Sequence, residues 1–231
     1  MQLITVSGAP SSGKTSVILK AADCLRREGA RVGVVKFDCL ITDDDARYRA
    51  AGFPSRKGLS KELCPDHFFI TNIEDAWKWG ERQSLDYLVT ESAGLCNRCS
   101  PHIGGIPAFC VIDQLSGVHT PVKIGPMLRM ADAVVITKGD IVSQAEREVF
   151  EMKVRLANPR AEILHVNGLN GQGAQALAKL MARVGDPAPL KDRKLRFPMP
   201  MALCSYCLGE TKIGAEYQIG NLRKANWEDE A

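Results

Sequence analysis

The sequence lacks any long apolar run: nowhere do about 18 uncharged apolar residues, the length that a membrane helix needs, stand together. The N-terminal residues, MQLITVSGAP, also lack the basic stretch and the apolar segment of a secretion signal. We therefore expect a cytoplasmic protein without a membrane span.

A large excess of one charge is also missing. The formal net charge is +3, and Lys and Arg are spread along the chain rather than massed in one run. This balance gives no support for nucleic-acid binding. The 45% hydrophobic and 25% charged residues match an ordinary globular protein, which excludes disordered and fibrous classes. A chain of 231 residues has room for one α/β domain and a short appendage.

What the sequence does contain is an alternation of apolar, β-branched runs with helix-like segments, which is typical of a mainly parallel sheet flanked by helices. The runs that predict strands are Leu3–Val6, Val32–Phe37, Phe68–Thr71, Tyr87–Thr90, Phe109–Ile112, Ala133–Thr137 and Ile163–Val166. The stretches that predict helices are Lys14–Glu28, Ser143–Leu156 and Ala174–Val184. Composition changes after Gly185, so we expect an α/β domain over residues 1–185 and a short Cys-containing C-terminal extension over residues 186–231.

The strongest motif lies between the first predicted strand and the first predicted helix. Residues 8–15 read GAPSSGKT and fit the pattern G-x-x-x-x-G-K-[ST] of a phosphate-binding loop. Glycines let the backbone approach the phosphates, and N–H groups at the helix start supply partial positive charge. We expect Lys14 to contact the β- and γ-phosphates and Thr15 to ligate Mg²⁺. The predicted nucleotide-binding residues of this loop are Gly8, Ser11, Ser12, Gly13, Lys14 and Thr15.

Two carboxylates stand at the ends of predicted strands. Asp38 ends one strand and Glu91 ends another. The carboxyl ends of parallel strands face the crevice that holds a nucleotide. We expect both carboxylates to serve the Mg²⁺ and to act with Lys14 in hydrolysis. The alternative is that each is a solvated surface carboxylate.

Eight cysteines are many for a reducing compartment, and four of them form Cys-x-x-Cys pairs, namely Cys96 with Cys99 and Cys204 with Cys207. Two such pairs are the ligand set of a Cys₄ zinc site or of an iron–sulfur cluster. We expect the four thiolates to share one site, with His102 as a candidate extra ligand. A purely structural zinc that pins the extension and unrelated free thiols are the alternatives.

These motifs resemble those of the nickel-insertion GTPases of urease and hydrogenase maturation, the UreG and HypB group, with the cobalamin-related CobW proteins more distant. Residues 37–46, FDCLITDDDA, resemble that group's N-D-x-x-T-x-x-D-A segment, with Phe37 in place of the Asn. Residues 91–94, ESAG, resemble its E-S-G-G turn, whose acidic residue serves the Mg²⁺ and the switch region. The resemblance covers residues 1–185. It implies a P-loop NTPase fold and a GTPase that uses GTP and Mg²⁺.

The resemblance also implies a base-reading segment. GTPases of this group select guanine with N-K-x-D, whose Asp accepts hydrogen bonds from guanine N1 and N2. The matching residues 137–140 read TKGD, with Thr137 in place of the Asn, so Lys138 is expected to pack along the base and Asp140 to read it. Asn167 begins a segment that resembles the base-capping loop. From the residues alone, a chance Lys-x-Asp and a plain strand-to-helix turn are the alternatives.

The group's nickel-binding Cys-Pro-His has an imperfect counterpart in residues 64–67, which read CPDH. The extra Asp66 moves the imidazole by one residue, and Cys64 and His67 still suit Ni²⁺ or Zn²⁺. Two ligands cannot close a site, but the two subunits of a homodimer would supply four. The alternative is that both side chains are structural.

The leading hypothesis is a metallochaperone in which hydrolysis of Mg²⁺–GTP controls the delivery of nickel, zinc or an iron–sulfur cluster to a client metalloenzyme or its maturation factors. An ATPase, an iron–sulfur-binding nucleotide switch with little turnover and a small-molecule kinase are the alternatives. The sequence lacks an obvious Arg-rich lid, which argues against the kinase.

Overall fold

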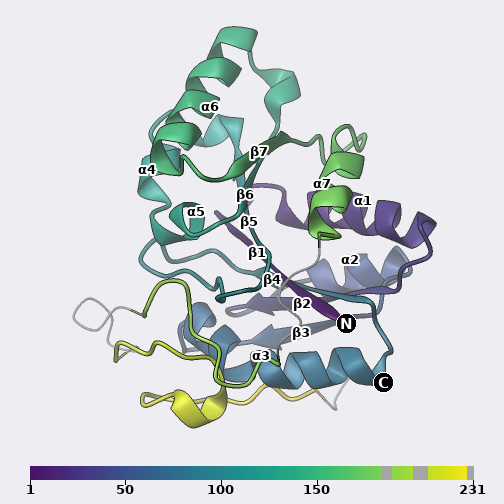
Figure 1. Cartoon of the computed structure of the whole chain (residues 1–231), viewed down its shortest axis with the longest axis vertical. Helices are drawn as coiled ribbons and strands as arrows, with labels where there is room; N and C mark the ends of the chain where they lie inside the picture. The colour runs from purple at the N-terminus through teal and green to yellow at the C-terminus, as the bar shows by residue number, and fades with distance from the viewer. Residues whose placement is uncertain (184–188, 200–207, 228–231) are drawn as a thin grey trace.

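A computed structural model of the chain describes residues 1–183, 189–199 and 208–227. Within these residues, seven parallel strands form one sheet in the order β3-β2-β4-β1-β5-β6-β7 (Figure 1). The strands are β1 Gln2–Gly8, β2 Val32–Asp38, β3 Ser55–Leu59, β4 Tyr87–Ser92, β5 Ala108–Asp113, β6 Ala133–Thr137 and β7 Glu162–His165.

The central strands are almost continuously apolar because helices cover both faces of the sheet. In β6, for example, Ala133 and Val135 pack into the cluster under α1 and α7, whereas Val134 and Ile136 pack on the opposite face under α6. The edge strand β3 carries Arg56 and Lys57 and has no apolar run. The pattern of apolar runs therefore could not reveal it.

The helices form two layers around the sheet. The α-helices are α1 Lys14–Arg27, α2 Asp44–Ala50, α3 Pro65–Arg82, α4 Thr120–Lys123, α5 Pro126–Arg129, α6 Gln144–Ala157 and α7 Ala174–Met181. Short 3₁₀ turns lie at η1 Gln114–Ser116, η2 Gly139–Ile141 and η3 Ala215–Tyr217. None of the helices in the described ranges is both long and apolar enough to cross a membrane.

The predicted strand Phe68–Thr71 is wrong, because these residues lie within α3. Pro65 occupies the first helical turn and Cys64 is the N-cap. Residues 65–73 of this helix are all buried, since the sheet covers one side and the C-terminal extension covers the other. A helix segment buried all round gives the same short apolar run as a buried strand.

The described parts of the extension lie against α3 rather than apart from the sheet. Leu190, Leu195, Met199 and Ile213 join the apolar cluster of Phe68, Phe69 and Ile73. The backbone N–H of Gly214 donates to the carbonyl of Ile70 at 2.9 Å. The division of the chain at residue 185 stays a prediction.

Candidate nucleotide and metal site

The phosphate-binding loop connects the end of β1 at Gly8 with the start of α1 at Lys14. Gly13 caps α1 with a φ of +89°, which favours glycine. A Cβ built on Gly8 would lie 2.0 Å from the carbonyl oxygen of Val111, so no larger residue fits there. The buried hydroxyl of Ser12 has no hydrogen-bond partner in the described part of the chain. The loop thus has the conformation and the free donor that phosphate binding requires.

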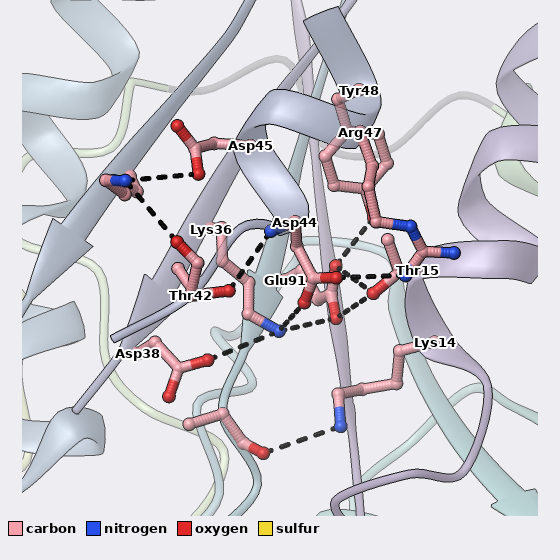
Figure 2. A network of polar contacts seen from close by, with 12 residues as sticks. Lys14, Thr15, Lys36, Asp38, Thr42, Asp44, Asp45, Arg47, Tyr48 and Glu91 are labelled. Atoms are coloured by element: carbon pink, nitrogen blue, oxygen red, sulfur yellow. Dashed lines mark hydrogen bonds and ion pairs between the residues drawn. The ribbon is translucent and has the colours of Figure 1, made fainter. Parts of the chain in front are cut away.

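Lys14 turns back over this loop. Its Nζ donates to the carbonyls of Gly8 at 3.0 Å and Ala9 at 2.8 Å, and reaches that of Ala93 at 3.4 Å. Figure 2 shows Lys14 near Thr15 and the carboxylate network, with its ammonium directed toward a carbonyl oxygen. Burial lowers the pKa of Lys14 to about 8, although Glu91 counteracts this. A negative charge beside this ammonium would favour its protonated form.

Glu91, near the end of β4, is almost fully buried and accepts hydrogen bonds from three sides (Figure 2). Thr15 Oγ1 donates to its two oxygens at 3.0 and 3.2 Å. The Tyr48 hydroxyl donates at 2.6 Å, and Lys36 Nζ lies 2.7 Å away. These contacts fix the carboxylate beside Thr15 at the start of α1.

Lys36 and Asp44 complete this network, and sequence analysis singled out neither of them. Lys36 Nζ lies 2.9 Å from Asp44 Oδ2 and 3.5 Å from Asp38 Oδ2, as well as beside Glu91. Burial is the largest single effect and would lower the pKa of Lys36, but Glu91 and Asp44 together outweigh it and the pKa is raised. For Asp44, burial is the largest single effect and opposes ionisation, but the hydrogen bond and the charge of Lys36, together with hydrogen bonds from Thr15 and Arg47, outweigh it and lower the pKa. The sequence could have indicated Lys36, because it lies two residues before Asp38 and therefore on the same face of the strand.

The segment 39–45 brings Asp44 to this point. Asp45 is fully buried and pairs with Arg49 at 2.8 Å and with Lys57 of β3 at 3.5 Å. The hydroxyl of Thr42 accepts from the backbone N–H of Asp44 at 3.3 Å. The start of α2 is therefore tied to β3 and faces the phosphate-binding loop. The hydroxyl of Thr15 and the carboxylates of Asp38, Asp44 and Glu91 offer the oxygen ligands that Mg²⁺ prefers.

The base-reading segment follows β6. Thr137 Oγ1 donates to the carbonyl of Ser12 at 2.7 Å, which ties this segment to the phosphate-binding loop. Lys138 Nζ donates to the carbonyl of Ser11 at 2.9 Å and lies 3.5 Å from Asp113 Oδ1. Asp140 and Asn167 line one pocket of about 260 Å³. His165 lines the same pocket.

A second polar cluster lies beside the turn that follows Glu91. Ligand atoms of Asp66, Cys96 and Cys99 all lie within 4.8 Å of one another. The two sulfur atoms are 3.8 Å apart, and Cys64 hydrogen-bonds Cys99. Both carboxylate oxygens of Asp66 are buried and have no hydrogen-bond partner among the described residues. Sequence analysis considered Asp66 only as an insertion.

The electrostatics of this cluster disfavour negative charge. Burial, followed by the neighbouring Cys64, raises the pKa of Asp66 to about 8. The hydrogen bond with Cys64, then burial and Asp66, raises the pKa of the Cys99 thiol. A bound cation would offset both effects. Two thiols and a carboxylate beside a third thiol suit a transition metal.

Two predicted ligands have other roles. His67 Nε2 lies 3.0 Å from Gln218 Oε1 and 3.4 Å from Glu210 Oε1, so the extension engages this imidazole. His102 is not available as an extra ligand: its Nδ1 bonds Thr5, and its Nε2 bonds Ser7 and the carbonyl of Met127.

Cys204 and Cys207 lie outside the described residues. Met199, which is the last described residue before them, packs in the same apolar cluster as Cys99.

Comparison with known proteins gives consistent matches. A family model described as CobW/HypB/UreG, nucleotide-binding domain, matches residues 2–165. An uncharacterized protein of Methanocaldococcus jannaschii is 47% identical over 97% of this chain and 96% of its own length. Urease accessory protein UreG 2 of a Bradyrhizobium species is 28% identical, with 78% of this chain and 89% of that protein covered.

Two solved structures share the fold. Hydrogenase maturation factor HypB from Archaeoglobus fulgidus superposes with a TM-score of 0.62 at 21% identity, over 78% of this chain and 88% of that chain. HypB from Helicobacter pylori, solved in complex with nickel, superposes with a TM-score of 0.63 at 19% identity. This match covers 82% of this chain and 91% of that chain. The predicted P-loop fold is thereby confirmed.

Proposed function

This chain belongs to the CobW/HypB/UreG family of nucleotide-binding domains, and on that premise we propose that it is a GTPase that couples hydrolysis of Mg²⁺-bound GTP to the binding and delivery of a transition metal. One observation carries the proposal: a single short turn contacts both sites. A Cβ on Gly94 would lie 1.7 Å from the carbonyl oxygen of Gly8, and Cys96, two residues later, belongs to the thiol cluster.

In this proposal the triphosphate binds to the N–H groups of residues 8–15, a site to which Gly8, Ser11, Ser12 and Gly13 contribute. Lys14 exchanges its carbonyl partners for the β- and γ-phosphates. Because its ammonium is buried, its attraction to phosphate is screened little by water. Lys14 therefore stabilises the negative charge that grows on the phosphate during hydrolysis.

Thr15, Asp38 and Glu91, joined by Asp44, would hold Mg²⁺, which neutralises charge on the phosphate oxygens when bound. Lys36 keeps these carboxylates together through its ammonium. Asp38, which is more exposed than Glu91, is placed by this proposal beside the attacking water, where it orients the water and accepts its proton. Glu91 accepts a hydrogen bond from the Thr15 hydroxyl and so orients that oxygen.

The base specificity that we propose is for guanine. Asp140 accepts hydrogen bonds from guanine N1 and N2, which adenine cannot provide, and Lys138 lies along the base. Asn167 Oδ1 accepts from the backbone N–H groups of Leu169 at 2.8 Å and Asn170 at 3.1 Å, and these bonds shape the capping loop.

For the metal, we propose Cys96, Cys99 and Asp66 as ligands, with Cys64 beside them. Soft sulfur favours Ni²⁺ or Zn²⁺ over Mg²⁺. Cys204 and Cys207 are proposed to complete the thiolate set, which would then also suit an iron–sulfur cluster. The contacts of His67 with the extension favour Asp66 over His67 as the partner of Cys64.

The metal is cargo for a client metalloenzyme or its maturation factors, and the protein acts as a cytoplasmic homodimer in this proposal. Support comes from the named relatives, which include a urease accessory protein and a hydrogenase maturation factor. One of the similar structures was solved with nickel.

Protein purified without oxygen tests the proposal. We expect phosphate release from GTP to exceed that from ATP, and elemental analysis to find a transition metal whose amount changes with a non-hydrolysable GTP analogue. The double variants C96S/C99S and C204S/C207S should lose metal to the same extent. A matched control is Cys24→Ser on α1.

Each alternative gives a different result. A phosphorylated small molecule in place of free phosphate would indicate a kinase. A brown protein with little turnover would indicate an iron–sulfur switch. Metal binding that ignores GTP, or that survives in both double variants, would overturn the coupling.

A further inference from the structure

The pocket beside Asp140 contains a basic side chain that the proposed function does not use. Arg147 lies in the first turn of α6 and lines this pocket together with Asp140 and Asn167. Its Nε is buried, and no hydrogen-bond partner for it occurs among the described residues. Within the residues that the structure describes, neither Arg147 nor Asp140 forms an ion pair. The pocket is therefore lined by a basic and an acidic side chain that do not neutralise each other.

The backbone of Gly139 fixes the place of this arginine. A Cβ built on Gly139 would lie 3.4 Å from Arg147 Nε and 3.9 Å from its Cζ, so the guanidinium packs directly against that backbone. Gly139 separates Lys138 from Asp140, the two residues of the base-reading segment. Arg147 is therefore held beside the segment that faces the base.

The guanine acceptors O6 and N7 need a hydrogen-bond donor, and Thr137 cannot supply it. A hydroxyl has one proton, and Thr137 Oγ1 donates it to the carbonyl of Ser12 at 2.7 Å. Lys138 Nζ is also engaged, by the carbonyl of Ser11 and by Asp113. Among these groups, the guanidinium of Arg147 has the uncommitted donor.

Guanine presents donors at N1 and N2 and acceptors at O6 and N7, and an arginine matches the second pair with two parallel N–H groups. We propose that Arg147 is a second base-reading residue, which donates to guanine O6 and N7 while Asp140 accepts from N1 and N2. Adenine carries an amino group where guanine has O6, so the arginine donors oppose it. This inference rests on the proposed function, because it requires a guanine nucleotide in this pocket.

Calorimetric titration with GDP, 7-deaza-GDP, IDP and ADP tests the inference on the full chain. Wild type should bind 7-deaza-GDP about tenfold more weakly than GDP, since N7 is replaced by a carbon. Arg147→Met should bind GDP about 10- to 100-fold more weakly and should no longer distinguish GDP from 7-deaza-GDP. The preference for GDP over IDP, which Asp140 determines through N2, should be kept. Arg160→Met, at an exposed arginine after α6, is the matched control.

The outcomes separate the inference from the proposed function. If wild type binds ADP as tightly as GDP, guanine specificity itself fails. If wild type prefers GDP over ADP but Arg147→Met keeps full GDP affinity, only the role of Arg147 fails. Should that variant not fold, Arg147→Lys keeps the charge and loses the paired donors. Equal binding of GDP and 7-deaza-GDP by wild type overturns the inference without any variant.

Discussion

Replacing Asp66 by Asn should stabilise the metal-free protein at neutral pH and weaken its binding of metal. Asp66 is fully buried, and both oxygens lack hydrogen-bond partners among the described residues. Burial, with Cys64 as a second cause, raises its pKa from 3.8 to about 8. Ionisation of this carboxyl group is therefore unfavourable in the folded protein, and in the proposed function a bound cation would offset that cost.

The magnitude follows from proton linkage. Between pH 4 and 8 the folded state keeps the proton of Asp66 while the unfolded chain releases it, so the free energy of unfolding falls as pH rises. The loss is about 1.4 kcal/mol per pH unit, or about 4 kcal/mol at pH 7 relative to pH 4. Asparagine has no proton to release. The variant should therefore match wild type at pH 4 and exceed its stability by about 4 kcal/mol at pH 7.

Urea denaturation with a chelator and a reductant, at pH values from 4 to 7.5, measures this difference. Other titrating groups such as His102 are common to both proteins, so their effects cancel in the comparison. Glu148→Gln, at an exposed carboxylate of α6, is the control. Zn²⁺ at 100 times its dissociation constant should then raise wild-type stability by about 2.7 kcal/mol, and this gain should be lost in the variant.

Two results would refute this reasoning. Parallel stability curves for wild type and Asp66→Asn would mean that the carboxyl group is solvated in the folded state. An undiminished gain from Zn²⁺ in the variant would mean that Asp66 is not a metal ligand.

Three further predictions concern single side chains. Lys14→Ala should abolish tight GTP binding in a fluorescence titration at an almost unchanged melting temperature, because its contacts are backbone carbonyls; wild-type affinity would contradict the phosphate site. Asp140→Asn should weaken GTP at least about tenfold more than ATP, and equal losses would indicate an ATPase. Burial, with Arg196 second, lowers the pKa of His102 from 6.5 to about 3. In the Asp66→Asn background, stability should therefore fall by about 1.4 kcal/mol per unit as pH drops below 6.5, and His102→Gln should flatten this slope in urea titrations.

The features that sequence analysis predicted depend on local patterns. The phosphate-binding loop needs only the spacing of Gly8, Gly13 and Lys14, and the covered strands need only continuous apolar runs. The strand prediction at Phe68–Thr71 failed because the C-terminal extension buries the outer side of α3. No local pattern reveals a cover that comes from residues about 140 positions later.

The candidate site could be predicted only in part, because many of its contacts join residues that are distant in the sequence. Glu91 follows a recognisable strand, but its partners Lys36 and Tyr48 come from β2 and α2, which meet it only in the folded sheet. Asp66 was treated as an insertion between a cysteine and a histidine. Its role as a candidate ligand depends on the turn after β4, which brings Cys96 and Cys99 to the start of α3.

In the proposed function, the turn after β4 is the physical connection between the nucleotide site and the thiol cluster. Lys14 Nζ lies 3.4 Å from the carbonyl of Ala93, so a phosphate that draws Lys14 away removes a contact from this turn. Gly94 has a φ of +74° and lies directly against the carbonyl of Gly8, so the turn and the phosphate-binding loop are in close contact. Cys96 follows two residues later, and in the proposed function a shift of the turn changes the distance between its thiol and Asp66. Binding free energies are reciprocal. If bound nucleotide changes the affinity for a metal at Cys96, the bound metal must therefore change the affinity for nucleotide by the same factor.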